Sequence, residues 1–190
     1  MNDYLPDNFT IRGSLKVGIP MLVVPVLLLG AVLASHSFLL LDYLHVGSGL
    51  TWTGMDLILG LFFSNVMKGL SNEQRARVAM RLTPVMLFFM PSLTSVTVTA
   101  GVYLAIADGY FHPINRVIIV VLILVSILFI IGIGVFLPNE AMIYRELLRR
   151  GDMKKVVRLT MMNLRLSLLM VILQIVVILM MAQLATGVFI

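Results

Sequence analysis

Apolar residues occur along the chain in five long runs that short polar segments separate. The runs cover about residues 17–34, 38–67, 82–107, 117–137 and 164–190. A helix needs about 20 apolar residues to cross the hydrocarbon core of a bilayer, so each run is long enough to span a membrane. The pattern predicts an all-α fold, a polytopic integral membrane helix bundle with five transmembrane helices in a single domain, residues 1–190.

The composition agrees with this pattern and excludes several classes of protein. Of the 190 residues, 60% are hydrophobic and 12% are charged, and the mean hydropathy is +1.05. A soluble domain is about 45–50% apolar and about 25% charged, so a soluble enzyme, a DNA-binding module and a disordered tail are excluded. The chain contains no cysteine, which excludes disulfides, zinc–thiolate sites and iron–sulfur clusters.

The basic residues indicate how the chain is oriented. Cytoplasmic loops of membrane proteins are enriched in Lys and Arg. Of the 14 basic residues, 12 fall before the first run, between the second and third, or between the fourth and fifth. Arg165, at the start of the fifth run, lies on the same side and makes 13, while Arg116 alone falls on the other side. We expect a multi-pass protein of the plasma membrane with its N-terminus inside and its C-terminus outside. Short basic clusters without interleaved aromatic residues do not indicate a nucleic-acid partner.

The ends of the chain and the polar connections carry further signals. Arg12 and Lys16 before the first run resemble the basic flank of a signal peptide, but we interpret the run as a true span that two prolines bend. Residues 71–74, Ser-Asn-Glu-Gln, form a capping-box pattern before the third span. Residues 139–150 predict a cytoplasmic amphipathic helix that Gly151 ends, and Asp152 should cap the next helix. This basic segment could contact lipid headgroups or dock a soluble partner.

Polar residues within the spans share helical faces. On the second span, one face carries residues at steps of 3, 4, 3 and 4: Asp42, His45, Gly49, Trp52 and Asp56. On the third span, a matching face carries Thr83, Met86, Met90, Thr94, Thr97 and Gly101. The two helices are antiparallel, so Met90 and Thr94 should lie near Trp52 and Asp56, and Thr97 and Gly101 near His45. We expect a pocket between these two helices, with residues 38–107 as the core pair.

Each of these residues allows more than one interpretation. His45 could hydrogen-bond a carbonyl across the helix interface or could ligate haem or another metal. Asp56 could form a structural hydrogen bond or handle protons, and Asp42, near the outer end, is a second proton-handling candidate that could simply be solvated. Trp52 and most of the 14 methionines could serve in helix packing. His36 and His112 fall near outer loops.

The run from Leu44 to Gly54 matches the pattern LHxxxxxxWxG. It resembles the first core helix of a group of small membrane proteins that includes the copper-resistance D family, the membrane-bound protoporphyrinogen oxidase of bacteria and the membrane domain of bacterial urate oxidase. Residues 80–101 are similar to the second core helix of that group. The resemblance implies a haem b with His45 as an axial ligand. The second ligand would be a Met, His36 or His112, or the iron would be five-coordinate.

The resemblance and the polar faces together suggest a function. We expect a haem b protein or subunit that relays electrons between quinone and an outer-side partner, with His45, Gly49, Trp52, Met90, Thr94 and Thr97 around the cofactor. Two alternatives stay open: a non-catalytic structural subunit of a larger respiratory or membrane complex, and a protein that handles copper or another metal. Expected partners are the lipid bilayer, a quinone, and other membrane subunits or a second copy of this chain.

Overall fold

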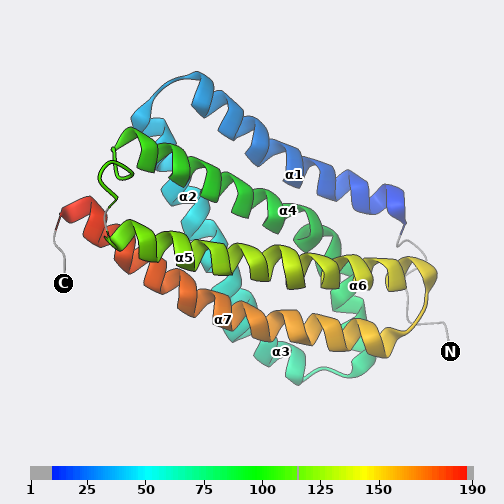
Figure 1. Ribbon diagram of the computed structural model, residues 1–190. Helices are drawn as coiled ribbons and strands as arrows, with labels where there is room; N and C mark the ends of the chain where they lie inside the picture. Colours follow the sequence, from blue (N-terminus) through cyan, green and yellow to red (C-terminus); the bar gives the residue numbers. More distant parts are fainter. Residues whose placement is uncertain (1–9, 115, 188–190) are drawn as a thin grey trace.

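The computed structural model describes residues 10–114 and 116–187, and these are almost entirely helical (Figure 1). In chain order the elements are α1 (Ile11–Ala34), α2 (Phe38–Leu57), the π-helix η1 (Ile58–Phe63), α3 (Ser64–Lys68), α4 (Asn72–Ala107), α5 (Arg116–Ile131), the π-helix η2 (Gly132–Phe136), α6 (Leu137–Arg149) and α7 (Met153–Thr186). Because α2, η1 and α3 are continuous, as are α5, η2 and α6, the elements form five long helices. All five are long and apolar enough to cross a membrane, as the sequence pattern predicts.

Several helices extend beyond the apolar runs. The third long helix begins at Asn72, where the Ser71 hydroxyl accepts from the Gln74 amide and the Gln74 side chain accepts from the Ser71 amide. The predicted capping box is thus confirmed. Asp152 caps α7, as expected, by accepting from two backbone amides. The segment predicted as a separate helix from residue 139 instead continues the fourth long helix without a break, and the left-handed Arg150 (φ 50°) ends it.

The helix α4 lies at the centre of the bundle. On one side it packs against α1 and α2, while α7 packs against α2, α5 and α6 (Figure 1). The Phe88 ring of α4 occupies the space where a side chain at Gly18 would lie, and the Ser92 hydroxyl donates to the Leu22 carbonyl of α1. The α4 and α5 helices, in contrast, make almost no direct backbone contact. The bundle is therefore tight around α4 except on the side that faces α5.

The outer surface of the bundle is apolar. Leu27 and Ile130 are each about two-thirds exposed, and Leu179 is 57% exposed. Large apolar side chains on the outside of a bundle are expected where lipid, rather than water, is the surrounding solvent. This surface supports a multi-pass membrane protein.

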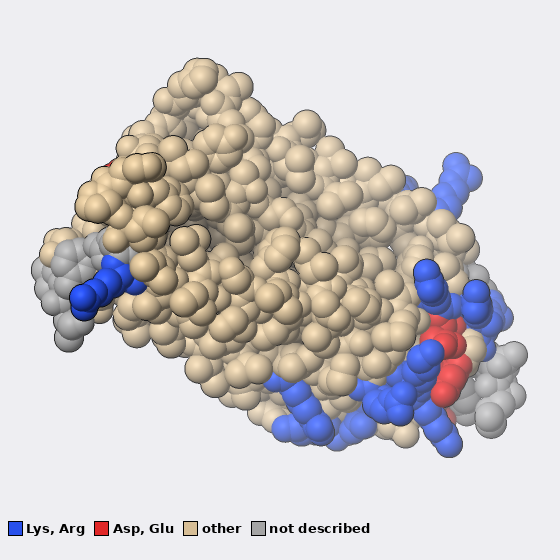
Figure 2. Space-filling model, viewed as in Figure 1, with Lys and Arg blue, Asp and Glu red and all other residues tan. Residues whose placement is uncertain are grey.

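Basic side chains gather at one end of the molecule, near the junction of α6 and α7 and the start of α4 (Figure 2). Lys155 there pairs with Glu146 at 2.7 Å, while Arg116 begins α5 at the opposite end. This separation of charge is the arrangement that the positive-inside rule relates to the cytoplasmic side.

Candidate functional site

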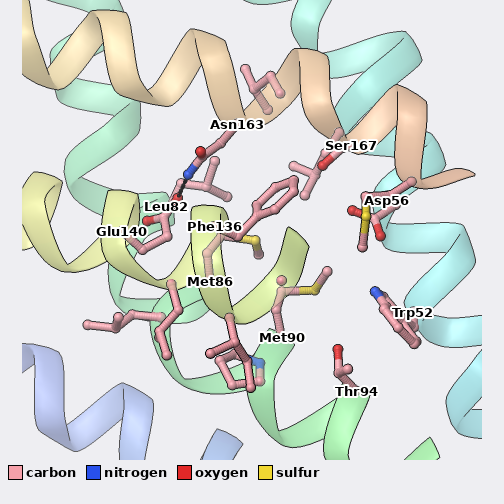
Figure 3. A pocket seen from close by; sticks show the side chains of 18 of the residues that line it. Trp52, Asp56, Leu82, Met86, Met90, Thr94, Phe136, Glu140, Asn163 and Ser167 are labelled. Carbon is pink, nitrogen blue, oxygen red and sulfur yellow. Dashed lines mark hydrogen bonds between the residues drawn. The ribbon is translucent and has the colours of Figure 1, made fainter. Parts of the chain in front are cut away.

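A cavity of about 140 Å³ lies inside the bundle between α2, α4, α7 and the continuous helix α5–η2–α6 (Figure 3). Most of its wall is apolar, with side chains such as Met86, Met90, Phe136, Leu164 and Met170. Polar side chains also line it: Trp52, Asp56, Thr94, Ser95, Glu140, Thr160, Asn163 and Ser167. The cavity is thus an apolar chamber with a small number of polar groups, which is the usual composition of a small-molecule site.

The cavity is open on the side where α4 and α5 separate. Three of its lining residues, Ser95, Phe129 and Ile133, are exposed on the outside of the bundle. Gly132 also lines the wall, and a Cβ atom added to it would meet no atom within 4 Å. Since this outer surface is apolar, the opening faces the region that lipid chains would occupy. A lipophilic molecule could therefore enter from the bilayer.

One polar group in the wall is the Asp56 carboxyl of α2, which is 1% exposed. The Gln174 amide of α7 donates to it at 3.0 Å (Nε2 to Oδ2). The Ser167 hydroxyl and the Trp52 indole also interact with this carboxyl, and both lie beside it in Figure 3. Asp56 thus links α2 to α7 in the interior of the bundle.

The second carboxyl is that of Glu140 on α6, which is 9% exposed. Asn163 of α7 donates to it at 2.8 Å (Nδ2 to Oε1), and Asn139 donates to the side-chain oxygen Oδ1 of Asn163 at 2.7 Å. The other oxygen of Glu140, Oε2, and the hydroxyl of Thr160 are buried and have no hydrogen-bond partner. The Thr83 hydroxyl of α4 also interacts with this carboxyl. Buried polar atoms are nearly always paired, so the two oxygens without a partner are candidates for contact with a molecule in the cavity.

Within the described residues, neither Asp56 nor Glu140 forms an ion pair with Lys or Arg. A buried carboxylate is costly in an apolar medium unless a cation or several donors compensate its charge. Two such groups in one apolar cavity are therefore candidates for binding or proton handling rather than for stability.

A stripe of small polar residues on α7 joins the two carboxyls. Thr160, Asn163, Ser167 and Gln174 are all buried and lie on one helical face at steps of 3, 4 and 7. Sequence analysis did not identify this stripe, although the same periodicity test that found the faces of the second and third spans would have revealed it. Glu140 was also missed as a site residue, because it was assigned to a cytoplasmic helix.

Two π-helices flank the cavity. Leu59 of η1 lines the wall close to Asp56, and Phe136 of η2 lines it close to Glu140. A π-helical turn adds a residue and rotates the side chains that follow, and such turns are frequent at functional sites. Here η1 brings Gly60 against the backbone of Leu168, where a Cβ atom would lie 2.6 Å from the amide nitrogen.

The residues predicted around a cofactor divide into two groups. Trp52, Met90 and Thr94 line the cavity with Asp56, so the structure brings these four together. His45, Gly49 and Thr97 instead lie in the contact between α2 and α4. Asp42 is partly exposed in the second turn of α2 and does not line the cavity.

His45 is held by α4. Its Nδ1 lies 2.9 Å from the Thr97 carbonyl oxygen, and its ring occupies the space beside Gly101. The Thr97 hydroxyl, in turn, donates to the Ser48 hydroxyl at 2.9 Å. The expected juxtaposition of His45 with Thr97 and Gly101 is confirmed, and the cross-helix hydrogen bond is one of the two interpretations considered for this histidine.

The structure offers a limited set of groups for haem or a metal. No cluster of three His, Asp or Glu ligands occurs among residues 10–114 and 116–187. The bond from Nδ1 to a carbonyl is the arrangement that orients a ligating histidine, but His45 does not line the cavity. The binding of haem by His45 therefore stays a prediction.

No protein-family model, curated protein or solved structure matches this chain. The functional argument accordingly depends on the cavity and on the polar residues that surround it.

Proposed function

We propose that this protein binds a quinone-class molecule in the cavity between α2, α4, α7 and the continuous helix α5–η2–α6 and takes part in electron transfer within the membrane. The observation that carries the proposal is a lipid-facing apolar cavity with two buried carboxyls in its wall, Asp56 and Glu140. A quinone combines an apolar tail with a ring that carries two oxygens. Both parts of such a molecule have a counterpart in this site.

The size of the cavity supports a ligand with a single ring. An apolar cavity of about 150 Å³ in another protein takes up one benzene molecule, and the cavity here measures about 140 Å³. A six-membered ring therefore fits, while a tetrapyrrole macrocycle is far larger. The tail of the ligand would leave through the opening beside Phe129 and Ile133, where both side chains face the outside of the bundle.

The binding step can be tested by fluorescence, because Trp52 is the only tryptophan in the chain and lines the cavity. We expect a benzoquinone with a ten-carbon tail to quench Trp52 emission in a saturable manner, with n-decanol at equal concentration as the tail-only control. Quenching that stays linear in quinone concentration, or that decanol abolishes, would contradict the proposal.

A haem b at His45 is a second candidate, and the contact of Nδ1 with the Thr97 carbonyl supports it. In that case His45 would hold the haem, which would supply one-electron chemistry between a quinol and a partner on the outer side. The test is the difference spectrum of the purified protein, oxidised against dithionite-reduced. A Soret shift that His45→Ala removes is expected, and a featureless spectrum refutes this assignment.

A further inference from the structure

One carboxyl oxygen in the cavity wall, Glu140 Oε2, has no donor within hydrogen-bond distance. In the described part of the chain, three buried side-chain atoms have no partner, and all three are oxygens: Glu140 Oε2, Thr160 Oγ1 and Gln174 Oε1. Two of these belong to residues that line the cavity. A carboxylate oxygen can only accept a hydrogen bond, so a ligand that contacts Glu140 Oε2 has to bring a donor unless the carboxyl is itself protonated.

The side-chain amides near the cavity each donate one hydrogen bond within the protein. The Asn163 side-chain amide donates to Glu140 Oε1 and the Gln174 amide donates to Asp56 Oδ2. The Asn139 amide donates to Asn163 Oδ1. The indole of Trp52 interacts with Asp56. An incoming carbonyl oxygen could accept from the Thr160 hydroxyl but would leave Glu140 Oε2 without a donor. An incoming hydroxyl could donate to Glu140 Oε2 and accept from Thr160, so it would pair both atoms.

From this we infer that the cavity selects the reduced, dihydroxy form of its ligand, a quinol, over the oxidised quinone. This inference rests on the proposed function and specifies the form of the substrate. One hydroxyl of the quinol donates to Glu140 Oε2 beside Thr160. The other points toward Asp56.

The geometry of α7 is consistent with a ring between the two carboxyls. Asn163, which holds Glu140, and Ser167, which interacts with Asp56, are one helical turn apart, a rise of about 6 Å. Oxygens in the para positions of a six-membered ring have a comparable separation. The oxidised form, with acceptors at both ends, would place its carbonyl oxygens against carboxyl oxygens and would leave Glu140 Oε2 without a donor.

The experiment is anaerobic isothermal titration calorimetry of the whole protein in detergent with the same decyl-benzoquinone in its reduced and oxidised forms. We expect the quinol to bind at least about tenfold more tightly than the quinone, since the difference includes a hydrogen bond to a buried acceptor. Glu140→Gln, which introduces an amide donor, should reduce this preference to about threefold or less. The matched control is Glu146→Gln on the same helix, where the carboxylate pairs with Lys155 outside the cavity and the preference should not change.

The outcomes separate this inference from the proposed function. Equal affinities for the two forms, or a preference that Glu140→Gln leaves intact, would overturn the inference while quinone binding stands. Absence of binding by either form would overturn both. Tighter binding of decylamine than of the quinol would identify a cation site and overturn the inference. Thr160→Val removes a hydroxyl that both forms can use, so it should weaken the binding of both and leave the preference unchanged. If Glu140→Gln does not fold, Glu140→Met removes the same acceptor together with the buried carboxyl and should likewise reduce the preference to about threefold or less.

Discussion

Replacing Gly132 with leucine would fill the cavity from the wall that η2 forms. This glycine lines the cavity, and a Cβ atom added there meets no atom within 4 Å, so the new side chain has room to enter without moving the backbone. A leucine side chain would take up much of a volume of about 140 Å³. The ring of a bound ligand would then be excluded from the cavity, although the tail could still contact the outer surface.

The expected size of the effect follows from the burial of the ring. Burial of a side chain of phenylalanine size is worth about 1.5–3 kcal/mol, and a six-membered ring is comparable. The loss of this term weakens binding by about 10- to 150-fold, because a factor of ten corresponds to about 1.4 kcal/mol. Folding should be retained, since glycine is a poor helix former and leucine is a good one.

The assay is the quenching of Trp52 emission by the ten-carbon benzoquinone, with thermal unfolding followed by circular dichroism to confirm the fold. Gly134→Leu is the matched control: this residue is two positions further along η2, also has open space around it, and does not line the cavity. The control should bind as the unmodified protein does. If Gly132→Leu also binds with unchanged affinity and an intact fold, the cavity is not the binding site and the reasoning is refuted.

Three other predictions concern the fold and its orientation. Gly60→Ala should destabilise the bundle by about 1–3 kcal/mol, because the new methyl group would lie 2.6 Å from the Leu168 backbone. Gly54→Ala is the control, since a methyl group there meets nothing within 4 Å and should not change the stability. Equal unfolding temperatures of the two variants in detergent would contradict the close approach of Gly60 to Leu168. Gln174→Leu removes the donor to Asp56 and should cost about 0.6–2 kcal/mol in the same measurement, and a gain in stability would argue against a structural role for this bond. The chain has no cysteine, so single cysteines can be introduced in place of Arg116 and, in a second variant, of a basic residue near the α6–α7 junction. A membrane-impermeant maleimide applied to whole cells should label only the cysteine at position 116. Labelling of the α6–α7 cysteine alone would reverse the predicted orientation.

The sequence by itself determined the helical architecture of this protein and indicated lipid as its surrounding medium. Runs of about 20 or more apolar residues have no stable alternative to spanning helices in lipid, because all backbone groups must be paired within the segment. Local signals also set helix ends correctly at Ser71 and Asp152, since capping depends on a few neighbouring residues. The contact of His45 with Thr97 and Gly101 could also be predicted from the sequence. Helical periodicity and the antiparallel pairing of the second and third spans are enough to predict it, and the positions of the other helices are not needed.

Only the tertiary structure decided which polar residues share a site. Glu140 and Asn163 are 23 positions apart, and Asp56 and Gln174 are 118 apart; no local pattern relates such pairs. The predicted pocket between two helices became a cavity among four, because α7 inserts its polar face beside Asp56 and because α4 and α5 stay apart. The same packing left His45 outside that cavity. Periodicity identifies the face of a helix, whereas the partner of that face depends on how all the helices pack together, and it is this packing that joins two isolated acids into one site.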